Sequence, residues 1–383
     1  MDFSLTPEQQ DLIALARDFA NREIAPHVAA YDRDERFPIE IITQAADLGL
    51  LGGVIPPNYG GAGLDHKTYA LLIEQISRVC HIIGVAMSLP SGLVGSSIHT
   101  YGTETQKQQY LTPLAQGKTF GAAGVTEARS GTDVSDMDTT CTRDGTDYII
   151  NGAKMWISFL DVAQWFLTFA HLGTNPQTQR KEICAFIIDR NLPGVSVHPV
   201  TNKFGFRPIK TGELALDHVR VPQTALLGQE GQGFQIAMNA VENGRLGVAA
   251  RATGLAQACV NTMTTYARER IVFGHPIAQF QMIQKLIADS ITTTNASRLL
   301  TLQLADLKDQ GQRARAQASM AKQYASDTAM NAATAAFQIH GAYGVSDEYP
   351  VGRYLRDAKI FQIVEGNNEL HRALIAQDAT GIR

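Results

Sequence analysis

The sequence predicts a multidomain α+β protein, with a helical N-terminal domain, an antiparallel β-barrel-like middle domain and a C-terminal four-helix bundle. Three observations predict it: helical patterning up to about residue 120, short β-rich runs from about 120 to 226, and long low-glycine stretches after about 233. A length of 383 residues suits two or three domains. We expect boundaries at 1–120, 121–232 and 233–383.

The N-terminal block opens with a helix start signal. Residues 6–9 (TPEQ) form a capping box with proline at the first helical position, so a helix should begin there. Leu12, Leu15, Phe19 and Glu23 would then share one face of this helix. The glycine- and proline-rich stretch 56–63 predicts a loop, and helical patterning returns over 69–79 and 104–115.

The middle block has the sequence pattern of β-strands. Four β-rich runs, punctuated by Gly, Asn, Asp and Pro, occur at 147–150, 165–169, 184–188 and 195–197. No helix-length segment separates them, which disfavours a doubly wound parallel sheet. The C-terminal block then offers two long helical stretches, 246–271 and 278–308. A last helix is expected over 368–380, with Asn367 or Asn368 as N-cap and Gly381 as stop.

Composition excludes several function classes. The net charge is −4, from 33 basic and 37 acidic residues, which gives no electrostatic basis for binding nucleic acid or an anionic membrane. No apolar run is expected to span a bilayer. Asp2, Glu8 and Asp11, with no early basic cluster, make a presequence unexpected, so the prediction is a cytoplasmic protein. Four dispersed cysteines and ten histidines without ligand spacing predict neither disulfides nor a metal site.

Seven segments, in order, resemble the acyl-CoA dehydrogenase family over essentially the whole chain. They are 57–65 (PNYGGAGLD), 101–117 (YGTETQKQQYLTPLAQG), 126–133 (TEARSGTD), 154–158 (KMWIS), 270–281 (RIVFGHPIAQFQ), 338–344 (QIHGAYG) and 356–372 (RDAKIFQIVEGNNELHR). The resemblance implies FAD-dependent dehydrogenation of an acyl thioester. A carboxylate removes the α-proton while hydride passes from Cβ to the flavin N5.

The resemblance places the catalytic base at Glu365. At the start of a helix the carboxylate is favoured, whereas burial raises its pKa, so the two effects allow a tunable base. Without the motif, Glu365 would be read as one more solvated glutamate. One branch of the family takes its base from the position before the arginine that here is Arg245, and this chain has Gly244 there.

The resemblance also implies cofactor and substrate contacts. Substrate contacts fall on Thr132, Glu242, Arg245 and Gly366; without the resemblance, Glu242 and Arg245 would be interpreted as a surface ion pair. Cofactor contacts fall on Val125, Thr126, Trp156, Ser158, Arg270, Phe273, Phe280, Gln281, Gln338, Gly341, Asn367 and Glu369. Among these, Arg270 would bind the FAD pyrophosphate, and Gln338 and Gly341 would reach a flavin held mainly by a neighbouring subunit. A homotetramer, as a dimer of dimers, is therefore expected.

Departures from the family pattern bear on the substrate. Ala128, Ser130 and Thr132 replace the usual proline, alanine and serine, and Asn367 replaces threonine. They would suit a branch that oxidises acyl or aminoacyl groups, such as prolyl, on a carrier protein. The substrate could therefore be either an acyl-CoA or an acyl-carrier protein. The acceptor could be an electron-transferring flavoprotein or, in an oxidase, oxygen. A non-catalytic thioester-binding member is the alternative of another class, and retention of Glu365 and Arg270 disfavours it.

Overall fold

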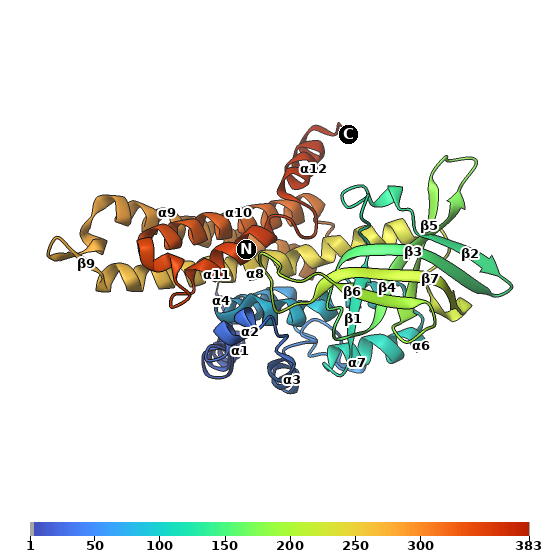
Figure 1. The fold of residues 1–383 in the computed structure, drawn as a ribbon, viewed down its shortest axis with the longest axis horizontal. Helices are drawn as coiled ribbons and strands as arrows, with labels where there is room; N and C mark the ends of the chain where they lie inside the picture. The colour runs from blue at the N-terminus through green and yellow to red at the C-terminus, as the bar shows by residue number, and fades with distance from the viewer. Residues whose placement is uncertain (1–3, 383) are drawn as a thin grey trace.

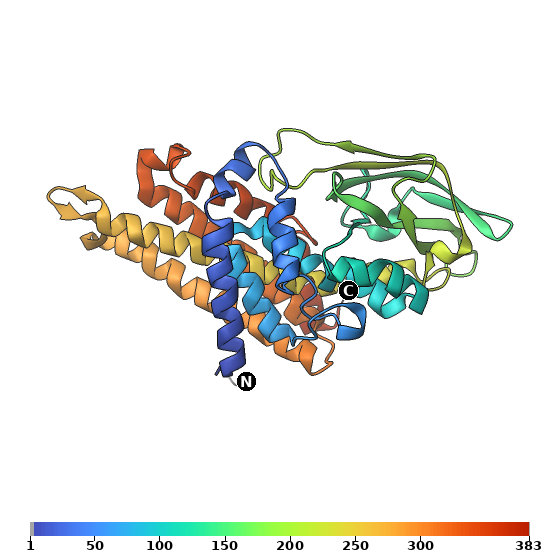
Figure 2. The same ribbon diagram turned by 90° about the horizontal axis from the view of Figure 1, so that it is seen from below.

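A computed structural model describes residues 4–382; residues 1–3, which include Asp2, and 383 lie outside the described part. The molecule is elongated, with a β domain at one end, a helical bundle at the other and N-terminal helices packed across the bundle (Figures 1 and 2). This order of helices, sheet and helices confirms the predicted fold class. The exact domain boundaries stay a prediction.

The N-terminal region is helical. Its main elements are α1 (Pro7–Phe19), α2 (Val28–Arg33), α3 (Ile39–Asp47), α4 (His66–Ser91), α5 (Gly95–Tyr101), α6 (Glu104–Gln106) and α7 (Thr112–Ala115), with π-helical turns at Ala20–Ile24 and Lys107–Leu111. The capping box is present: Thr6 Oγ1 accepts from Gln9 N, and Gln9 Oε1 accepts from Thr6 N.

The predicted face of α1 is wrong in part. The helix buries Ile13, Ala16 and Phe19 and leaves Leu15 41% exposed. Phe19 is shared with the predicted face, but Ile13 and Ala16 are buried in place of Leu12 and Leu15, because this side of α1 packs against α4. The turn Ala20–Ile24 continues this buried face.

One stretch, His66–Tyr101, is apolar and long enough to cross a membrane, contrary to the prediction. However, 67% of its most apolar window is buried inside the protein, where α4 packs against α8 (Gly233–Glu269). It is therefore a core helix of the folded protein. Its helical path is interrupted at Cys80, where φ is −149° and ψ is 102°.

The middle domain is one mixed eight-stranded sheet. Its strands are β1 (Phe120–Gly124), β2 (Thr140–Asp144), β3 (Asp147–Ser158), β4 (Ala163–Thr174), β5 (Lys181–Asp189), β6 (Val195–Pro199), β7 (Thr211–Val221) and β8 (Leu226–Leu227). The order is β6-β7-β3-β2-β4-β5-β8, with β1 paired to β4. Most pairs are antiparallel as predicted, but β1 and β4 are parallel and β2 meets β4 in parallel at one residue pair. The chain between β1 and β4 contains the β2–β3 hairpin, a connection long enough to return the chain in the same direction beside β1.

The C-terminal bundle consists of α8, α9 (Gln281–Asp309), α10 (Arg315–His340) and α11 (Val351–Phe361). A short antiparallel ribbon of β9 (Ile271–Val272) and β10 (His275–Pro276) lies at the α8–α9 turn. The buried face of α10 is mostly alanine, which lets α8 and α10 pack closely. The final helix, α12 (Asn368–Thr380), begins and ends where predicted. Asn367 caps it by accepting from Leu370 N, and Gly381 ends it in the left-handed region, at φ 68°.

Candidate active site

Glu365 lies in the short loop between α11 and α12. The chain turns sharply there: Glu365 has φ 55° and Gly366 φ 91°, a strained backbone for a glutamate. Two buried side chains hold the turn. Lys322 Nζ donates to the Gly366 carbonyl (2.7 Å) and to Asn368 Oδ1 (2.9 Å), and His371 Nε2 lies 3.3 Å from the Glu365 carbonyl oxygen.

The turn directs the Glu365 side chain inward against α8. The side chain is only 13% exposed, and its Oε2 is buried with no hydrogen-bond partner in the described part of the chain. It lies so close to Gly244 that a Cβ there would come within 2.2 Å of Oε2. A carboxylate with a free, buried oxygen is the arrangement that proton abstraction in a closed site requires.

Burial and charge act on Glu365 in opposite directions. Burial raises its pKa, and the nearby cations Arg251, Arg245 and Lys322 lower it, with burial the larger effect. Burial also lowers the pKa of Lys322 to about 8. The pKa of His371 falls to about 3 through burial and the neighbouring cations, so this imidazole is neutral at physiological pH.

Glu242 and Arg245 do not form the surface pair that the plain sequence pattern allowed. Glu242 Oε2 accepts instead from Arg315 Nε at 3.2 Å. Arg245 is buried, its Nε has no hydrogen-bond partner among the described residues, and burial lowers its pKa. The structure thus brings Arg245 to Glu365 and leaves Glu242 at the rim of a groove.

That groove has a volume of about 640 Å³. One wall is the N-terminal part of α8 and the other is the end of α9 with the turn into α10. Three cations line it, Lys308, Arg313 and Arg315, beside the apolar Phe234 and Met238. A groove of this size, lined mainly by polar and charged side chains with a few apolar ones, suits a ligand that carries both an extended polar arm and negative charge.

Residues predicted to contact the flavin ring lie on β3 and the loop before it. Trp156 is 59% exposed and adopts φ 63°, so its ring projects from the sheet. Ser158 Oγ lies 3.5 Å from Thr211 Oγ1, at the outer limit of a hydrogen bond. Thr126 O accepts from Met155 N at 2.8 Å, which ties the loop to the strand. The exposed aromatic face and the weakly bonded hydroxyl fit a planar ring with polar edges.

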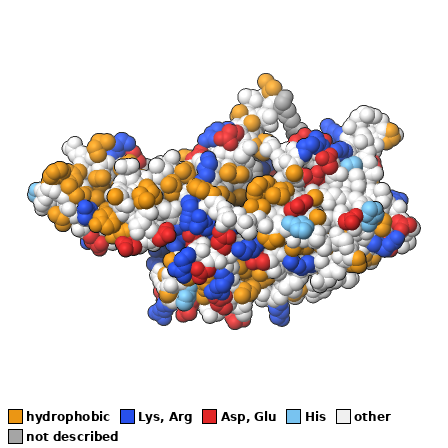
Figure 3. Space-filling view, in the orientation of Figure 1, with side chains coloured by type: hydrophobic (Ala, Val, Ile, Leu, Met, Phe, Trp, Pro, Cys, Tyr) orange, Lys and Arg blue, Asp and Glu red, His pale blue; other side chains and the backbone are white. Residues whose placement is uncertain are grey.

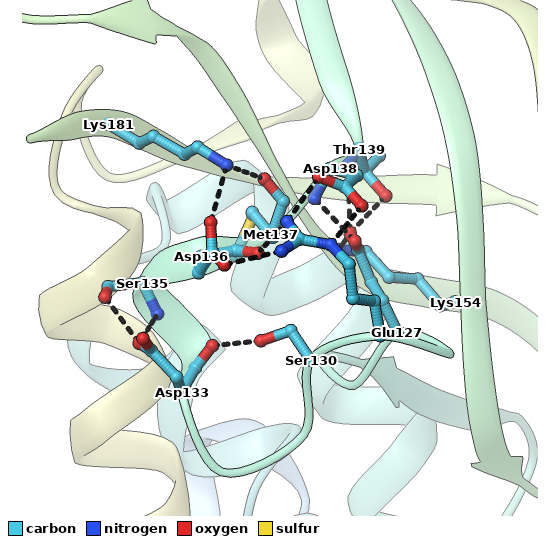
Figure 4. Close-up of polar contacts among 11 residues, drawn as sticks. Glu127, Ser130, Asp133, Ser135, Asp136, Met137, Asp138, Thr139, Lys154 and Lys181 are labelled. Atoms are coloured by element: carbon cyan, nitrogen blue, oxygen red, sulfur yellow. Dashed lines mark hydrogen bonds and ion pairs between the residues drawn. The ribbon is translucent and has the colours of Figure 1, made fainter.

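A buried ion pair fixes that loop (Figure 4). Lys154 Nζ lies 2.7 Å from Glu127 Oε1, and the lysine side chain is fully buried. The same carboxylate accepts from Thr139 N (2.9 Å), Thr139 Oγ1 (2.6 Å) and Asp138 N (2.5 Å). The segment that carries Val125, Thr126 and the exposed Thr132 is therefore anchored at both ends to β2 and β3.

The remaining predicted cofactor residues lie at the other end of the bundle. Arg270 ends α8 and stacks on the Tyr343 ring at 5.4 Å, and Phe273, 90% exposed, packs edge-on to Phe280. Gln281 begins α9, while Gln338 and Gly341 lie at the end of α10. With 1.5 Å of rise per residue, Gly244 and Arg270 are ~39 Å apart along α8. One copy of the chain does not bring the two groups of residues together.

On α12, Asn367 is the N-cap and Glu369 is exposed, its carboxylate 4.0 Å from Arg372. Gly366 lies at the turn beside Glu365, and its contact with substrate stays a prediction. Sequence reasoning missed Arg251, Lys322 and His371. The signal was present for Arg251, a lone charge inside the apolar run 246–258 of a helix.

Comparison with known proteins identifies the chain. Three models describe the acyl-CoA dehydrogenase N-terminal, middle and C-terminal domains, and they match residues 6–118, 122–219 and 231–380. The chain belongs to the acyl-CoA dehydrogenase family. It is thus an oxidoreductase of a flavin-dependent family that acts on acyl-CoA.

Individual relatives agree along their full lengths. An acyl-CoA dehydrogenase of Bacillus subtilis is 41% identical, with 98% of this chain and 99% of that one covered. The solved butyryl-CoA dehydrogenase of Megasphaera elsdenii is 37% identical with a TM-score of 0.95, covering 99% of this chain and 100% of that one. The prolyl acyl carrier protein oxidase AnaB is 28% identical with a TM-score of 0.94, covering 98% and 100%.

Proposed function

We propose that the protein dehydrogenates an acyl-CoA thioester between Cα and Cβ, with Glu365 as the base that removes the α-proton. The observation that carries this proposal is the buried, unpartnered Oε2 of Glu365 beside Gly244. Arg251, Arg245 and Lys322 lower the pKa of this carboxyl against the effect of burial, which favours the ionised form that a base needs.

FAD fits the residues that the resemblance assigns to it. Val125, Thr126, Trp156 and Ser158 would hold the ring, with Asn367 and Glu369 at the α12 start close by. From a second copy, Arg270, Phe273, Phe280, Gln281, Gln338 and Gly341 would hold the phosphates and the adenosine half. The flavin, when bound, accepts the hydride that leaves Cβ. The chain's own residues position the thioester, exclude water and take the proton on a carboxylate oxygen of Glu365.

The thioester arm would lie in the groove along the N-terminal part of α8. Glu242 at its rim, Arg245 behind it and Thr132 on the opposite loop would contact the arm, and Gly366 would face the thioester. The cations Lys308, Arg313 and Arg315 favour CoA, because its phosphates carry negative charge next to the arm. The similarity of relatives named for butyryl-CoA suggests a short acyl chain.

Assembly would complete the site. Large apolar side chains lie exposed at the end of the bundle that bears the β9–β10 ribbon, among them Ile271 (54%), Phe273 (90%) and Met282 (72%), and Figure 3 shows hydrophobic side chains along this arm. We expect them to pack in a homotetramer, a dimer of dimers, in which each flavin contacts two subunits. Light scattering of the flavin-loaded protein tests this, and a monomer that retains FAD would contradict it.

Electrons would leave to an electron-transferring flavoprotein. We expect the protein in the cytoplasm, where its four buried free cysteines would remain reduced. The test of the function is anaerobic bleaching of the bound flavin by a panel of acyl-CoA esters and by the same acyl groups on carrier protein. Bleaching by a CoA ester supports the proposal. Bleaching by carrier-bound acyl or prolyl groups alone would instead make this a biosynthetic enzyme.

A further inference from the structure

Arg251 is a buried arginine whose closest charged partner is the proposed base. It lies in the middle of α8 and is 4% exposed. Its Nη2 is 3.9 Å from Glu365 Oε1, and its Nε donates to the Gly247 carbonyl at 3.0 Å, which fixes the direction of the side chain. Its guanidinium also lies 6.0 Å from the centre of the Phe361 ring. Contacts on several sides therefore hold the charge against the carboxylate.

Small residues make room for this contact. A Cβ at Gly84 of α4 would lie 3.2 Å from Arg251 Cγ and 2.3 Å from Ser77 Oγ. A Cβ at Gly244 of α8 would overlap the Glu365 carboxylate. The arginine and the glutamate thus occupy space that glycines on two different helices leave open.

Other charged or titratable groups face Glu365 but are engaged differently. On α8, Arg245 is buried, yet no direct contact between it and the carboxylate occurs within 4.0 Å among residues 4–382. On α10, Lys322 is bonded to the Gly366 carbonyl and Asn368, that is, to the loop rather than to the carboxylate. On α12, the neutral His371 contacts the backbone of Glu365. Arg251 alone of these groups reaches a carboxylate oxygen.

We propose that Arg251 is a positioning residue that holds the Glu365 carboxylate in its buried orientation and keeps it ionised between turnovers. An opposite charge at this distance favours the anion, and in a dry site it does so more strongly than in water. The direction of the pKa effects agrees, since Arg251 is the foremost influence that opposes burial at Glu365. The inference rests on the proposed role of Glu365, but its test need not involve catalysis.

The test is an infrared pH titration of the flavin-loaded protein labelled with ¹³C at the glutamate carboxyls, without substrate. E365Q identifies the Glu365 band by its loss. In R251M we expect the midpoint of that band to rise by about one to three pH units. R251K, which keeps the charge, should have a midpoint close to that of the wild type. R268M is the matched control, because Arg268 lies exposed on the last turn of the same helix.

Each outcome bears on the inference. The inference would be overturned if the midpoint of the Glu365 band in R251M equals that of the wild type. It would also be overturned if the midpoint in R251K is raised as much as in R251M. If R251M does not fold, R251Q is compared with R251K in the same titration, and equal midpoints for these two would overturn it as well. A raised midpoint in a protein whose flavin no acyl thioester bleaches would support Arg251 while rejecting the proposed function. Bleaching of the wild type by an acyl-CoA, together with an unchanged midpoint in R251M, would support the proposed function and reject the role of Arg251.

Discussion

Gly244 lies directly against Glu365: a Cβ at position 244 would be 2.2 Å from Oε2 and 2.7 Å from Cδ of the glutamate. Contacts below 3 Å force one of the two groups to move, and the carboxylate is the group that can. The position that precedes Arg245 is therefore part of the site, although glycine itself contributes no chemical group.

G244A is expected to slow flavin reduction about 100-fold, because displacing a base by about 1 Å has an effect of this size. The protein should still fold, since alanine stabilises a helix by about 1 kcal/mol relative to glycine. Anaerobic stopped-flow bleaching measures the rate. G352A is the control, because its Cβ would meet only Gly344 O at 3.7 Å. Equal rates for G244A and the wild type would reject this packing argument.

The raised pKa of Glu365 predicts how stability depends on pH. The folded protein binds the proton of the Glu365 carboxyl more tightly than the unfolded chain does. The stability that this proton contributes is therefore complete below the ordinary pKa of 4.5, and it is lost as the pH rises through the pKa of Glu365 in the folded protein. E365Q, which stays neutral, should therefore raise the free energy of unfolding at neutral pH and not below pH 4.5. Each unit by which the pKa is raised contributes about 1.4 kcal/mol.

Urea unfolding of wild type and E365Q across this pH range gives the comparison. E348Q, at an exposed glutamate, should follow the wild type at every pH. A lower stability of E365Q at neutral pH would mean that the cations around the carboxylate outweigh the effect of burial.

K154M should destabilise the protein by about 3–5 kcal/mol, because it leaves the Glu127 carboxylate buried without its cation. The double variant E127L/K154M should be less destabilised than K154M, since it buries no unpaired charge. Chemical denaturation measures both, with K118M as an exposed control. A K154M protein as stable as the wild type would show that the backbone and hydroxyl donors to Glu127 suffice.

R270A should weaken FAD retention, because a permanently charged guanidinium at the end of α8 would lose its contact with the pyrophosphate. Loss of one charge-assisted contact of about 1.5–3 kcal/mol corresponds to roughly 10- to 100-fold weaker binding. Flavin content after extended dialysis measures it. R268A removes another exposed arginine two residues earlier and should retain FAD. Equal flavin content in R270A would remove this residue from the proposed site.

Local signals predicted the parts of the fold that are set locally. The capping box at residues 6–9 and the Asn367 and Gly381 ends of α12 involve contacts over three or four residues, so the sequence pattern was enough. The buried face of α1 was wrong because packing against α4, about 60 residues later, selects the face. Likewise, the parallel pairing of β1 with β4 depends on the whole path of the sheet.

The candidate site shows the same limit. Glu365 could be predicted from the motif around it, whereas its surroundings come from distant positions. Arg251 stands out in the sequence as a lone charge in the run 246–258, but nothing there relates it to Glu365, and no short motif marks Lys322. The folded chain shows that both residues are buried and carry their charges near the base. Conversely, Glu369 stands one turn from Glu365 in sequence and yet points to solvent, because the backbone turns at Gly366.

The most direct test of the account compares wild type and E365Q under anaerobic conditions, each loaded with FAD and mixed with the acyl-CoA that bleaches the wild type fastest. The account predicts equal flavin content in the two proteins and no bleaching of E365Q on the timescale of many wild-type turnovers, because a glutamine at position 365 cannot accept the α-proton. Bleaching of E365Q at a rate close to that of the wild type would contradict it and place the base at another residue.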